Sequence, residues 1–554
     1  MIPYLSTMKI FLITAFAFFT VCGFSQNCTT NTFRPVTRNN VIEWEKFPVF
    51  SLPFKVIYNG SRLGDTQSKP LRHGFSHIAF LAGNEGATLP FNSRATLYNA
   101  LATPNYGVPQ PWSIRNLESP WGNDLSFYRS YWDNLSRTYA NFFSDSFNSG
   151  IPKFNLLCFD IERMLDTDLE ILRIKTDPRV PAQFRALPDA EFIKQYKIEI
   201  QSLYAQSVKH LKAKGLPNGT LIGSYSDVPI RGSFLNWLDM TRYTWNEWKT
   251  NPEVPLYLTR DLQTGKVGGE FYNQLDFLTP STYYFYDYNS PLGKEYLSYL
   301  LFTIEVNRAW SDKDIIPFIW LKYHNEFNPT TPFIPAFMAE ASAIFPFFSG
   351  AKGIWLWDNP IDRNDNYATY EYFINGLYRL SQHKDMFEGA YELLIPQAAR
   401  DHYELRNTIW RGVVKGNQIL IAAHNPYAIE NQTDSLLVTY KGWAKKIALK
   451  GRETALCRFD WTAPNDFFFK LSELKIFPNP VENKLQFEYL SFDNVEGVSQ
   501  IIDANGRLIS EEKMLTGNGK ITKKIDTTNL LPGVYFLNII ADNARLTQKF
   551  YVLK

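Results

Sequence analysis

The segment NLLCFDIERM, residues 155–164, decides how this chain is expected to fold. An apolar run leads directly into Asp160, Ile161 and Glu162. Buried carboxylates are costly unless something pairs with them or uses them. Side chains alternate along a strand, so Asp160 and Glu162 share one side of it. The segment therefore predicts a buried strand whose carboxyl end carries a pair of acids.

The sequence on both sides of this strand alternates between strand-like and helix-like patterns over residues 45–395. The stretch 189–215 carries an apolar stripe at helical spacing and stops at a glycine. Apolar strands alternating with helices are typical of a parallel sheet covered on both faces, most simply a (β/α)8 TIM barrel. The expected strands are 47–59, 75–83, 155–162, 220–227, 275–285, 314–324 and 351–360, with further helices at 293–310 and 333–350.

Two small all-β sandwich domains are expected after the barrel. Residues 396–465 contain short alternating strands with Lys-Gly and Asn-Pro turns, the pattern of a small sandwich. Residues 473–554 alternate in the same way, with turn signals at Asn505-Gly506 and Pro532-Gly533. The expected fold class is therefore α/β, a TIM barrel followed by two β-sandwiches.

The last of these units resembles the C-terminal sorting domain of the type IX secretion system of Bacteroidetes. The resemblance implies export across the outer membrane by the type IX secretion machinery, followed by release or attachment to the cell surface. The matching elements are FPNPV at 477–481, D-x-x-G-R at 503–507, LPGVYF at 531–536 and the closing QKFYVLK at 548–554.

The first 25 residues have the features of a signal peptide. Lys9 precedes an apolar run from Ile10, and Gly23-Phe24-Ser25 offers a small-x-small cleavage site before Gln26. The apolar run is too short for a comfortable membrane span. We therefore expect a secreted or cell-surface protein with no stable membrane span.

Composition argues against several other classes of protein. The net charge is +2 and phosphate-binding glycine loops are absent, so we expect no nucleic-acid partner and no cofactor. Aromatic residues make up 16% of the chain, which fits both sugar stacking and large aromatic cores. Cys28, Cys158 and Cys457 remain after cleavage, an odd and sparse set that predicts neither a disulfide framework nor a metal site. We expect the core to hold without disulfides.

Polar residues at the strand ends are the candidates for a functional site, because TIM barrels carry their active sites at the carboxyl ends of the strands. Asp160 and Glu162 end one strand. Carboxylates and aromatic rings around one mouth are typical of a sugar site. The other candidates for substrate contact are Tyr225, Asp227, Tyr283, Glu326, Trp357 and, in the aromatic loop YTWNEW, Glu247.

Five short motifs resemble, in the same order, those of the hyaluronidase family, glycoside hydrolase family 56. In this chain Ile161 replaces the family's tryptophan between the two acids, and the family's WRP sequence and disulfides are missing. These departures put the family's substrate in doubt more than its barrel. The motifs are NYGVPQ at 105–110, LLCFDIE at 156–162, LIGSYSDVP at 221–229, LTPSTYY at 278–284 and SGAKGIWLW at 349–357.

The resemblance implies a retaining endo-glycoside hydrolase that acts by substrate-assisted catalysis on an N-acetylhexosamine-containing glycan. Glu162 would be the general acid/base. Asp160 would raise the pKa of Glu162 and hold the acetamido group of the substrate. Tyr225 and Tyr283 would line the subsite of the reacting sugar, and Trp357 would form its hydrophobic wall.

Two alternatives stay open. Glu162 and Glu326 would suit an acid/base and nucleophile pair that acts on another polysaccharide, for instance a sulfated or uronic one. A non-catalytic carbohydrate-binding barrel would bind glycans without turnover. Trp355, two residues before Trp357 on the same face of its strand, raises a further choice, because one of these two rings is expected to be plain core.

Overall fold

The computed structural model describes the following residues of the chain: 28–29, 31, 33–34, 41–59, 68–79, 89–98, 113–114, 117–123, 125–142, 150–161, 167–232, 237–324, 328, 330, 332–358, 367–462, 474–491, 496–515, 519–541 and 544–553. The predicted signal peptide, the motif at 105–110 and the carboxylates Glu162 and Glu326 lie outside these residues.

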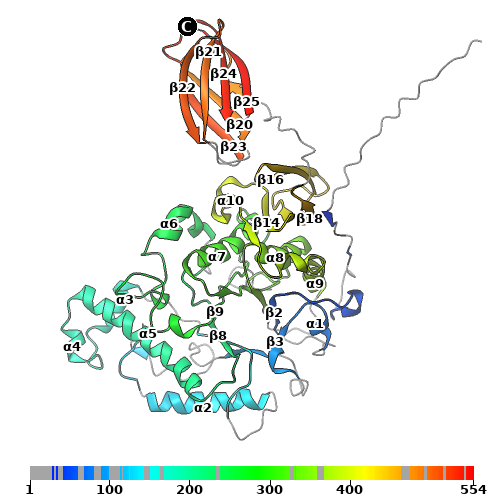
Figure 1. The fold of residues 1–554 in the computed structure, drawn as a ribbon. Coiled ribbons are helices and arrows are strands. Elements are labelled where there is room, and N and C mark those ends of the chain that lie inside the picture. The colour runs from blue at the N-terminus through cyan, green and yellow to red at the C-terminus, as the bar shows by residue number, and fades with distance from the viewer. Residues whose placement is uncertain are drawn as a thin grey trace, which may run out of the picture.

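Short parallel strands run through the middle of the N-terminal part of the molecule (Figure 1). They are β2 (Lys55–Tyr58), β3 (His77–Ile78), β4 (Ala95–Tyr98), β7 (Leu156–Phe159), β8 (Leu221–Ser224), β9 (Phe277–Leu278), β10 (Asp314–Ile315), β11 (Phe318–Ile319) and β12 (Gly353–Leu356). Each segment predicted as a strand contains at least one of them. β4 was not predicted, because its four residues are too few to show a clear pattern.

These strands pair in three parallel sheets, in the orders β11-β12-β2-β3, β4-β7-β8 and β10-β9. The pairs are in register, so that Leu156 to Phe159 of β7 face Leu221 to Ser224 of β8. The carboxyl ends of neighbouring strands therefore lie at the same edge. Isolated parallel bridges link strands of different sheets: Ile78 to Arg94, Tyr225 to Thr279, and Ser281 to Phe318.

Side chains on these strands alternate between two apolar cores. In β7, Leu156 and Cys158 belong to an inner cluster, whereas Leu157 and Phe159 belong to the larger cluster that includes the helices. This alternation is the expected period of a strand with both faces buried. The buried members of the inner cluster are Ile57, Ala79, Ala95, Leu156, Cys158, Tyr225, Phe277, Tyr283, Phe285, Ile316, Phe318, Trp320 and Trp355.

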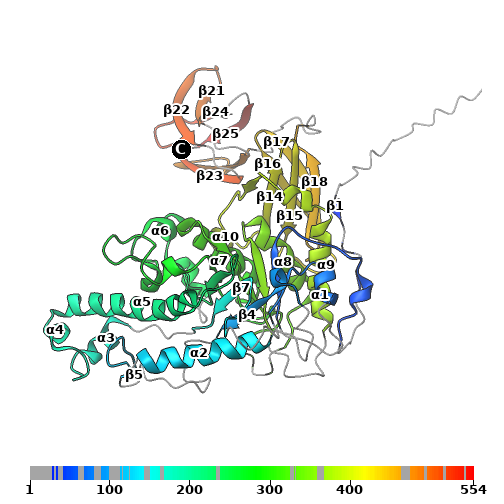
Figure 2. The ribbon, with the colours of Figure 1, turned by 60° about the horizontal axis from the view of Figure 1, so that its bottom comes forward.

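Helices cover the strands. α7 and α8 are buried along almost their whole length, and α8 contacts α9 and the later strands β14 and β15 (Figures 1 and 2). Within the described residues, no helix has the length and apolarity needed to span a bilayer. The α-helices are α1 (Ser68–Arg72), α2 (Leu125–Phe142), α3 (Asp168–Ile174), α4 (Ala182–Arg185), α5 (Asp189–Ala213), α6 (Trp245–Thr250), α7 (Tyr296–Trp310), α8 (Ala336–Phe348), α9 (Ala368–Ser381) and α10 (Ala399–Leu405).

Short 3-10 helices fill several of the connections. The long connection between β8 and β9 holds η5, η6 and η7 together with α6, in place of one covering helix. The 3-10 helices are η1 (Trp44–Lys46), η3 (Phe91–Ser93), η5 (Trp237–Arg242), η6 (Tyr257–Thr259), η7 (Tyr272–Gln274), η8 (Gly293–Glu295) and η9 (Lys384–Phe387).

An antiparallel sheet of order β1-β18-β15-β14-β13 follows the helices, and the hairpin β16-β17 packs on it through a shared apolar core that includes Trp410, Val438 and Trp443. A second small hairpin, β5-β6, lies near the start of α2. The strands are β1 (Cys28–Thr29), β5 (Ser113–Ile114), β6 (Leu117–Glu118), β13 (Glu392–Leu394), β14 (Ile409–Lys415), β15 (Gln418–His424), β16 (Thr433–Tyr440), β17 (Trp443–Lys450) and β18 (Ala455–Asp460).

Two further antiparallel sheets, β19-β20-β23 and β22-β21-β24-β25, share one buried core near the C-terminus (Figure 1). Alternate residues of β20, Leu485, Phe487 and Tyr489, point into this core, as their spacing predicts. The strands are β19 (Lys475–Phe477), β20 (Lys484–Ser491), β21 (Glu496–Asp503), β22 (Leu508–Leu515), β23 (Gly519–Asp526), β24 (Gly533–Ala541) and β25 (Ala544–Val552).

The expectation that the protein holds together without disulfides is wrong. Cys28 and Cys457 form a disulfide between β1 and β18, and Cys158 is a buried free thiol. The two bonded cysteines are 429 residues apart, so spacing along the chain carries no information about them. Antiparallel pairing of β1 with β18 places them directly opposite each other.

Replacing Cys28 and Cys457 together by serine is expected to lower the free energy of unfolding by about 2–4 kcal/mol. The bond closes a loop between residues 429 apart, so its loss frees the unfolded ensemble more than the folded one. The measurement is the melting temperature of the mature protein by calorimetry, with and without a thiol reductant. The wild type should fall to the melting temperature of the double variant when it is reduced. A wild type that is insensitive to reductant, or a variant that melts like the wild type, would contradict this.

Candidate active site

Backbone hydrogen bonds hold the carboxyl ends of several parallel strands in fixed register. The Asp160 amide donates to the Tyr98 carbonyl at 3.2 Å, and the Tyr225 amide donates to the Phe159 carbonyl at 2.7 Å. On the other side, the Trp357 amide donates to the Ile319 carbonyl at 2.9 Å. The backbone hydrogen bonds of the sheet thus fix the positions of the residues that follow β7, β8 and β12.

Asp160 and Asp227 both act electrostatically on the Cys158 thiol. Burial raises the pKa of the Cys158 thiol, and the negative charges of Asp160 and Asp227 raise it further. Asp160 continues the alternation of Leu156 and Cys158, which puts it on the inner side of β7. It is partly exposed, so it stands where the inner cluster opens to solvent.

The structure brings together the three aromatic residues predicted from the sequence. The Tyr283 ring lies 6.1 Å from Tyr225 and 5.7 Å from Trp357, measured between ring centroids. Both tyrosines are buried, whereas Trp357 is partly exposed against the inner cluster. The Tyr225 hydroxyl donates a hydrogen bond to Ser281 Oγ at 3.2 Å, which fixes that ring. We call Asp160, Tyr225, Asp227, Tyr283 and Trp357 the strand-end group.

Asp227 is a buried member of this group. Its Oδ2 accepts a hydrogen bond from Ser224 Oγ at 2.7 Å, across the turn that leaves β8. Between them Ser226 has a φ of +63°, the left-handed region that residues other than glycine rarely adopt. Such strained backbone persists where the surrounding structure enforces it, and it is often found at functional sites.

Trp320 extends the aromatic wall and Asp358 holds it in place, although neither residue was among the candidate site residues predicted from the sequence. Asp358 Oδ1 accepts from the Trp320 indole at 3.0 Å, and Oδ2 accepts from the Tyr370 hydroxyl at 2.8 Å. The Trp320 ring then meets Trp357 edge-on at 4.9 Å and Tyr283 at 5.7 Å. The signal that could have found Asp358 is its position directly after Trp357 at the strand end.

The structure also decides which of Trp355, in β12, and Trp357, just after β12, belongs to the core. Trp355 is fully buried, stacks on Phe318 at 5.0 Å and donates its indole hydrogen bond to Asn59 Oδ1 at 3.1 Å. It is therefore plain core. Trp357 is the ring that reaches the surface of the inner cluster.

Glu247 does not join the strand-end group in this structure. It is exposed at the start of α6, where its carboxylate accepts hydrogen bonds from the Thr244 amide and hydroxyl, both at 2.8 Å. These hydrogen bonds hold the pKa of Glu247 below its usual value. Its contacts among the described residues are those of a helix-capping residue, and none of them is with Tyr225, Tyr283 or Trp357.

Among the described residues, no cluster of three or more histidine, cysteine, aspartate or glutamate side chains is arranged to hold a metal ion. His324 lies five residues after β11, where its ring stacks on Tyr283 at 6.1 Å and lies 4.7 Å from the Phe285 ring.

Comparison with protein families confirms the sorting domain. Residues 475–553 match the family described as the secretion system C-terminal sorting domain. The chain is therefore a secreted or cell-surface protein that engages the type IX secretion machinery. No curated protein matches the chain as a whole or in part.

Solved structures that are similar to the chain include glycoside hydrolases. Bee venom hyaluronidase is 13% identical, with 58% of this chain and 99% of that chain covered, at a TM-score of 0.38. A family 30 subfamily 8 xylanase from Clostridium acetobutylicum is 9% identical, with 89% and 98% covered, at a TM-score of 0.28. Because both TM-scores lie below 0.5, these likenesses support neither a shared fold nor a shared activity.

Proposed function

We propose that this protein is a secreted retaining endo-glycoside hydrolase that cleaves an N-acetylhexosamine-containing polysaccharide by substrate-assisted catalysis. The observation that carries the proposal is the strand-end group, in which the rings of Tyr225, Tyr283 and Trp357 lie together and the carboxylates of Asp160 and Asp227 both act on the Cys158 thiol of the same inner cluster. Carboxylates can hydrogen-bond sugar hydroxyl and amide groups, while aromatic rings can pack on the apolar faces of the sugar.

The proposed architecture is a closed (β/α)8 barrel over residues 45–395, followed by β-domains at 396–465 and 473–554. The parallel pairings and bridges support it, because they run from β2 through β3, β4, β7, β8, β9 and the consecutive pieces β10 and β11 to β12, which pairs with β2 again. The inner cluster supports it as well, since a small barrel is filled by side chains from all its strands.

In the proposed mechanism Glu162 protonates the glycosidic oxygen as the bond to C1 of the reacting sugar breaks. The acetamido oxygen of the same sugar attacks C1 and forms a cyclic oxazolinium ion. Glu162 then takes a proton from the water that opens this ring, so the configuration at C1 is retained. Asp160 orients the acetamido group, and its charge raises the pKa of Glu162 so that the acid stays protonated until it is needed.

The burial of the rings defines their proposed roles. Tyr225 and Tyr283 are only 4% and 5% exposed, so they would form the floor beneath the reacting sugar. Trp357, braced edge-on by Trp320, would be the wall against which the sugar face packs.

The test is hydrolysis of a panel of polysaccharides by the mature protein, with the reducing ends of the products identified. We expect internal cleavage of an N-acetylhexosamine-containing polymer, with inhibition by a thiazoline analogue of the oxazolinium ion. Cleavage without thiazoline inhibition would instead favour Glu162 paired with a second carboxylate such as Glu326. Binding without any cleavage would favour the non-catalytic alternative and contradict the proposal.

A further inference from the structure

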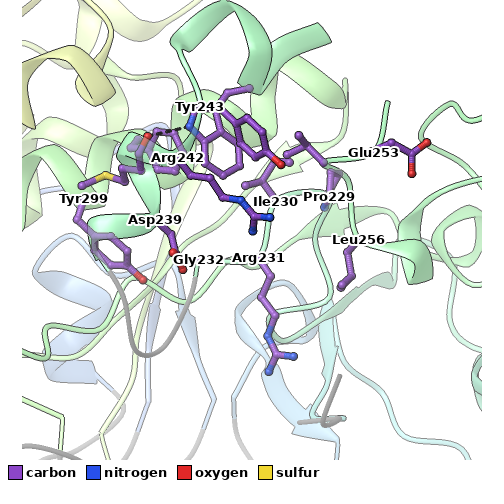
Figure 3. Close-up of a pocket in the computed structure, with 14 residues that line it drawn as sticks. Pro229, Ile230, Arg231, Gly232, Asp239, Arg242, Tyr243, Glu253, Leu256 and Tyr299 are labelled. Atoms are coloured by element: carbon purple, nitrogen blue, oxygen red, sulfur yellow. Dashed lines mark hydrogen bonds between the residues drawn. The ribbon is translucent and has the colours of Figure 1, made fainter. Parts of the chain in front are cut away.

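Residues of α7 line two cavities in the described part of the molecule. The first, of about 340 Å³, lies in the connection between β8 and β9 (Figure 3). Its arginines, Arg231 and Arg242, are balanced by Asp239 and Glu253, and Figure 3 shows the Arg231 guanidinium pointing away from Arg242. This first cavity therefore has no group of converging charges that would select a ligand.

The second cavity, of about 530 Å³, lies at the amino ends of β9 and β10. Asp276 directly precedes β9, and Asp314 is the first residue of β10. The strand-end group follows the carboxyl ends of its strands, so this cavity lies at the opposite end of the parallel strands from the candidate active site. We call it the amino-end cavity. The lining residues that matter below are Tyr272, Asp276, Trp310, Asp312, Lys313 and Asp314.

Trp310, the last residue of α7, is held in one orientation in the wall of the amino-end cavity. Its indole N–H donates to the Trp248 carbonyl at 2.7 Å, and the Trp248 indole donates in turn to the Met240 carbonyl at 2.9 Å. Trp310 is only partly buried. Because its polar N–H is already bonded to the protein, the part of the ring that faces the cavity is an apolar surface.

Tyr272 and Lys313 form a second fixed part of the lining. The Tyr272 hydroxyl and Ser311 Oγ share a hydrogen bond of 2.5 Å, and the Lys313 ammonium lies 4.6 Å from the centre of the Tyr272 ring. The same ammonium donates to the Leu275 carbonyl. An ammonium carries three donors, so this one bond leaves it able to donate to a ligand oxygen as well.

Two carboxylates of the lining keep acceptor oxygens for a ligand. Asp276 Oδ2 accepts from the Ile222 amide at 2.9 Å, and its other oxygen has no hydrogen bond within the described ranges. Asp312 is exposed, and it forms no hydrogen bond or ion pair with any residue that the structure describes. Asp314 differs from both, because Lys55 pairs with it at 3.2 Å.

The charges of the amino-end cavity favour a neutral ligand. Asp276 and Asp312 would repel a carboxylate, a sulfate or a phosphate, whereas the Lys313 ammonium would repel a cation. A neutral sugar unit suits all three groups, because its hydroxyls can both donate to carboxylates and accept from an ammonium. The C–H face of the same unit can pack on an aromatic ring such as that of Trp310.

We propose that the amino-end cavity is a second glycan-binding site, which holds a neutral sugar unit of a polysaccharide against the Trp310 ring. Asp276 and Asp312 accept hydrogen bonds from hydroxyls of this unit, and Lys313 donates to one of its oxygens. A chain bound here is not presented to the strand-end group, so the site keeps the protein on its polymer between cleavage events. The proposal rests on the proposed function for the choice of an N-acetylhexosamine probe.

The experiment measures equilibrium binding to the mature protein by calorimetry, without relying on turnover. The probes are neutral N-acetylchitohexaose, its cationic deacetylated form chitohexaose, and an acidic hyaluronan hexasaccharide. The wild type should bind N-acetylchitohexaose at the amino-end cavity. Tighter binding of either charged probe at a site that depends on Asp312 would contradict a neutral ligand and overturn the proposal.

Trp310→Ala and Asp312→Ala should each weaken binding of N-acetylchitohexaose at this site by about 10-fold or more. Trp310 also packs on the core, whereas Asp312 is exposed, so the second variant keeps the test independent of folding. Glu191→Ala removes an exposed carboxylate of α5 outside the cavity and should bind like the wild type. The proposal is overturned if N-acetylchitohexaose does not bind, or if it binds Asp312→Ala as it binds the wild type.

Trp357→Ala separates this proposal from the proposed function, because Trp357 belongs to the strand-end group at the other end of the strands. Binding that survives Trp357→Ala and is lost in Asp312→Ala, in a protein that cleaves no polysaccharide, would keep the second site and remove the hydrolase. Cleavage of a polysaccharide together with binding that is indifferent to Trp310 and Asp312 would keep the hydrolase and remove the second site.

Discussion

On the proposed function, Glu162→Gln is expected to lower kcat for polysaccharide hydrolysis by about 10²–10⁴-fold. Glutamine keeps the size and polarity of the side chain but has no proton to give to the glycosidic oxygen. The leaving group would then depart as an unprotonated alkoxide, which is a poor leaving group. The KM should change little, because the exchange removes an interaction made mainly in the transition state.

The identity of the leaving group provides the sharpest measurement. A synthetic substrate with a nitrophenyl leaving group needs little protonation, so formation of the cyclic intermediate should be far less impaired in Glu162→Gln than it is with the natural glycan. Asp385→Asn, an equivalent exchange in the surface pair with Arg458, is the matched control and should keep wild-type kcat. Wild-type activity in Glu162→Gln would remove Glu162 from the mechanism, and equal losses on both substrates would remove its role as an acid.

Glu305→Gln is expected to lower the free energy of unfolding by about 3–5 kcal/mol. Glu305 on α7 and Arg411 on β14 form an ion pair with side chains 2% and 0% exposed. The Arg411 Nε donates to Glu305 Oε1 at 2.9 Å, and Ser349 Oγ donates to the same oxygen at 2.9 Å. Without the carboxylate, a buried guanidinium loses its counter-charge, and the cost of its desolvation is no longer offset.

Other groups around this ion pair also depend on the Glu305 carboxylate. Glu305 Oε2 also accepts from the Ala399 amide at 2.9 Å, so the carboxylate holds the start of α10 as well. His402 sits beside Arg411, and burial together with the charge of Arg411 lowers the pKa of His402 to about 3. The imidazole is therefore neutral at ordinary pH and adds no second positive charge beside Arg411.

Calorimetry of the mature protein measures the effect, because a chain with several folding units need not unfold in one step. The double variant Glu305→Leu with Arg411→Met removes both charges, so it should recover much of the stability lost in Glu305→Gln. Asp385→Asn again serves as the control, since a surface pair contributes no more than about 1 kcal/mol. A Glu305→Gln protein that melts within about a degree of the wild type would contradict the coupling of α7 to the β14 sheet.

Several features of the fold could be predicted because their cause is local. The inner and outer faces of β7 follow from alternation along LLCF, and the buried stripe of α5 follows from helical spacing. The sorting domain was also recognisable, because four short motifs resemble those of the family in the same order. The short strand β4 was missed because four residues are too few to show a clear pattern. The helix α2 was missed although its apolar residues recur at helical spacing.

The candidate site was predicted in part, for a similar reason. Polar residues at strand ends identified Asp160, Tyr225, Tyr283 and Trp357, which the register of a parallel sheet brings to one edge. Glu247 looked equally suitable in the sequence, yet it caps α6, because the spacing Thr-x-x-Glu offers its carboxylate a local partner.

The sequence by itself determined the alternation of strands and helices, the acids at the end of β7 and the sorting signal of the C-terminal domain. Each of these features depends on residues that are close together in the chain. Only the tertiary structure decided the Cys28–Cys457 disulfide, the Glu305–Arg411 ion pair and the hydrogen bond from the Trp320 indole to Asp358. Each of these joins residues that are far apart in the sequence. These residue pairs come into contact only when whole helices and strands pack together. Packing depends on the whole chain, so no local sequence pattern contains it.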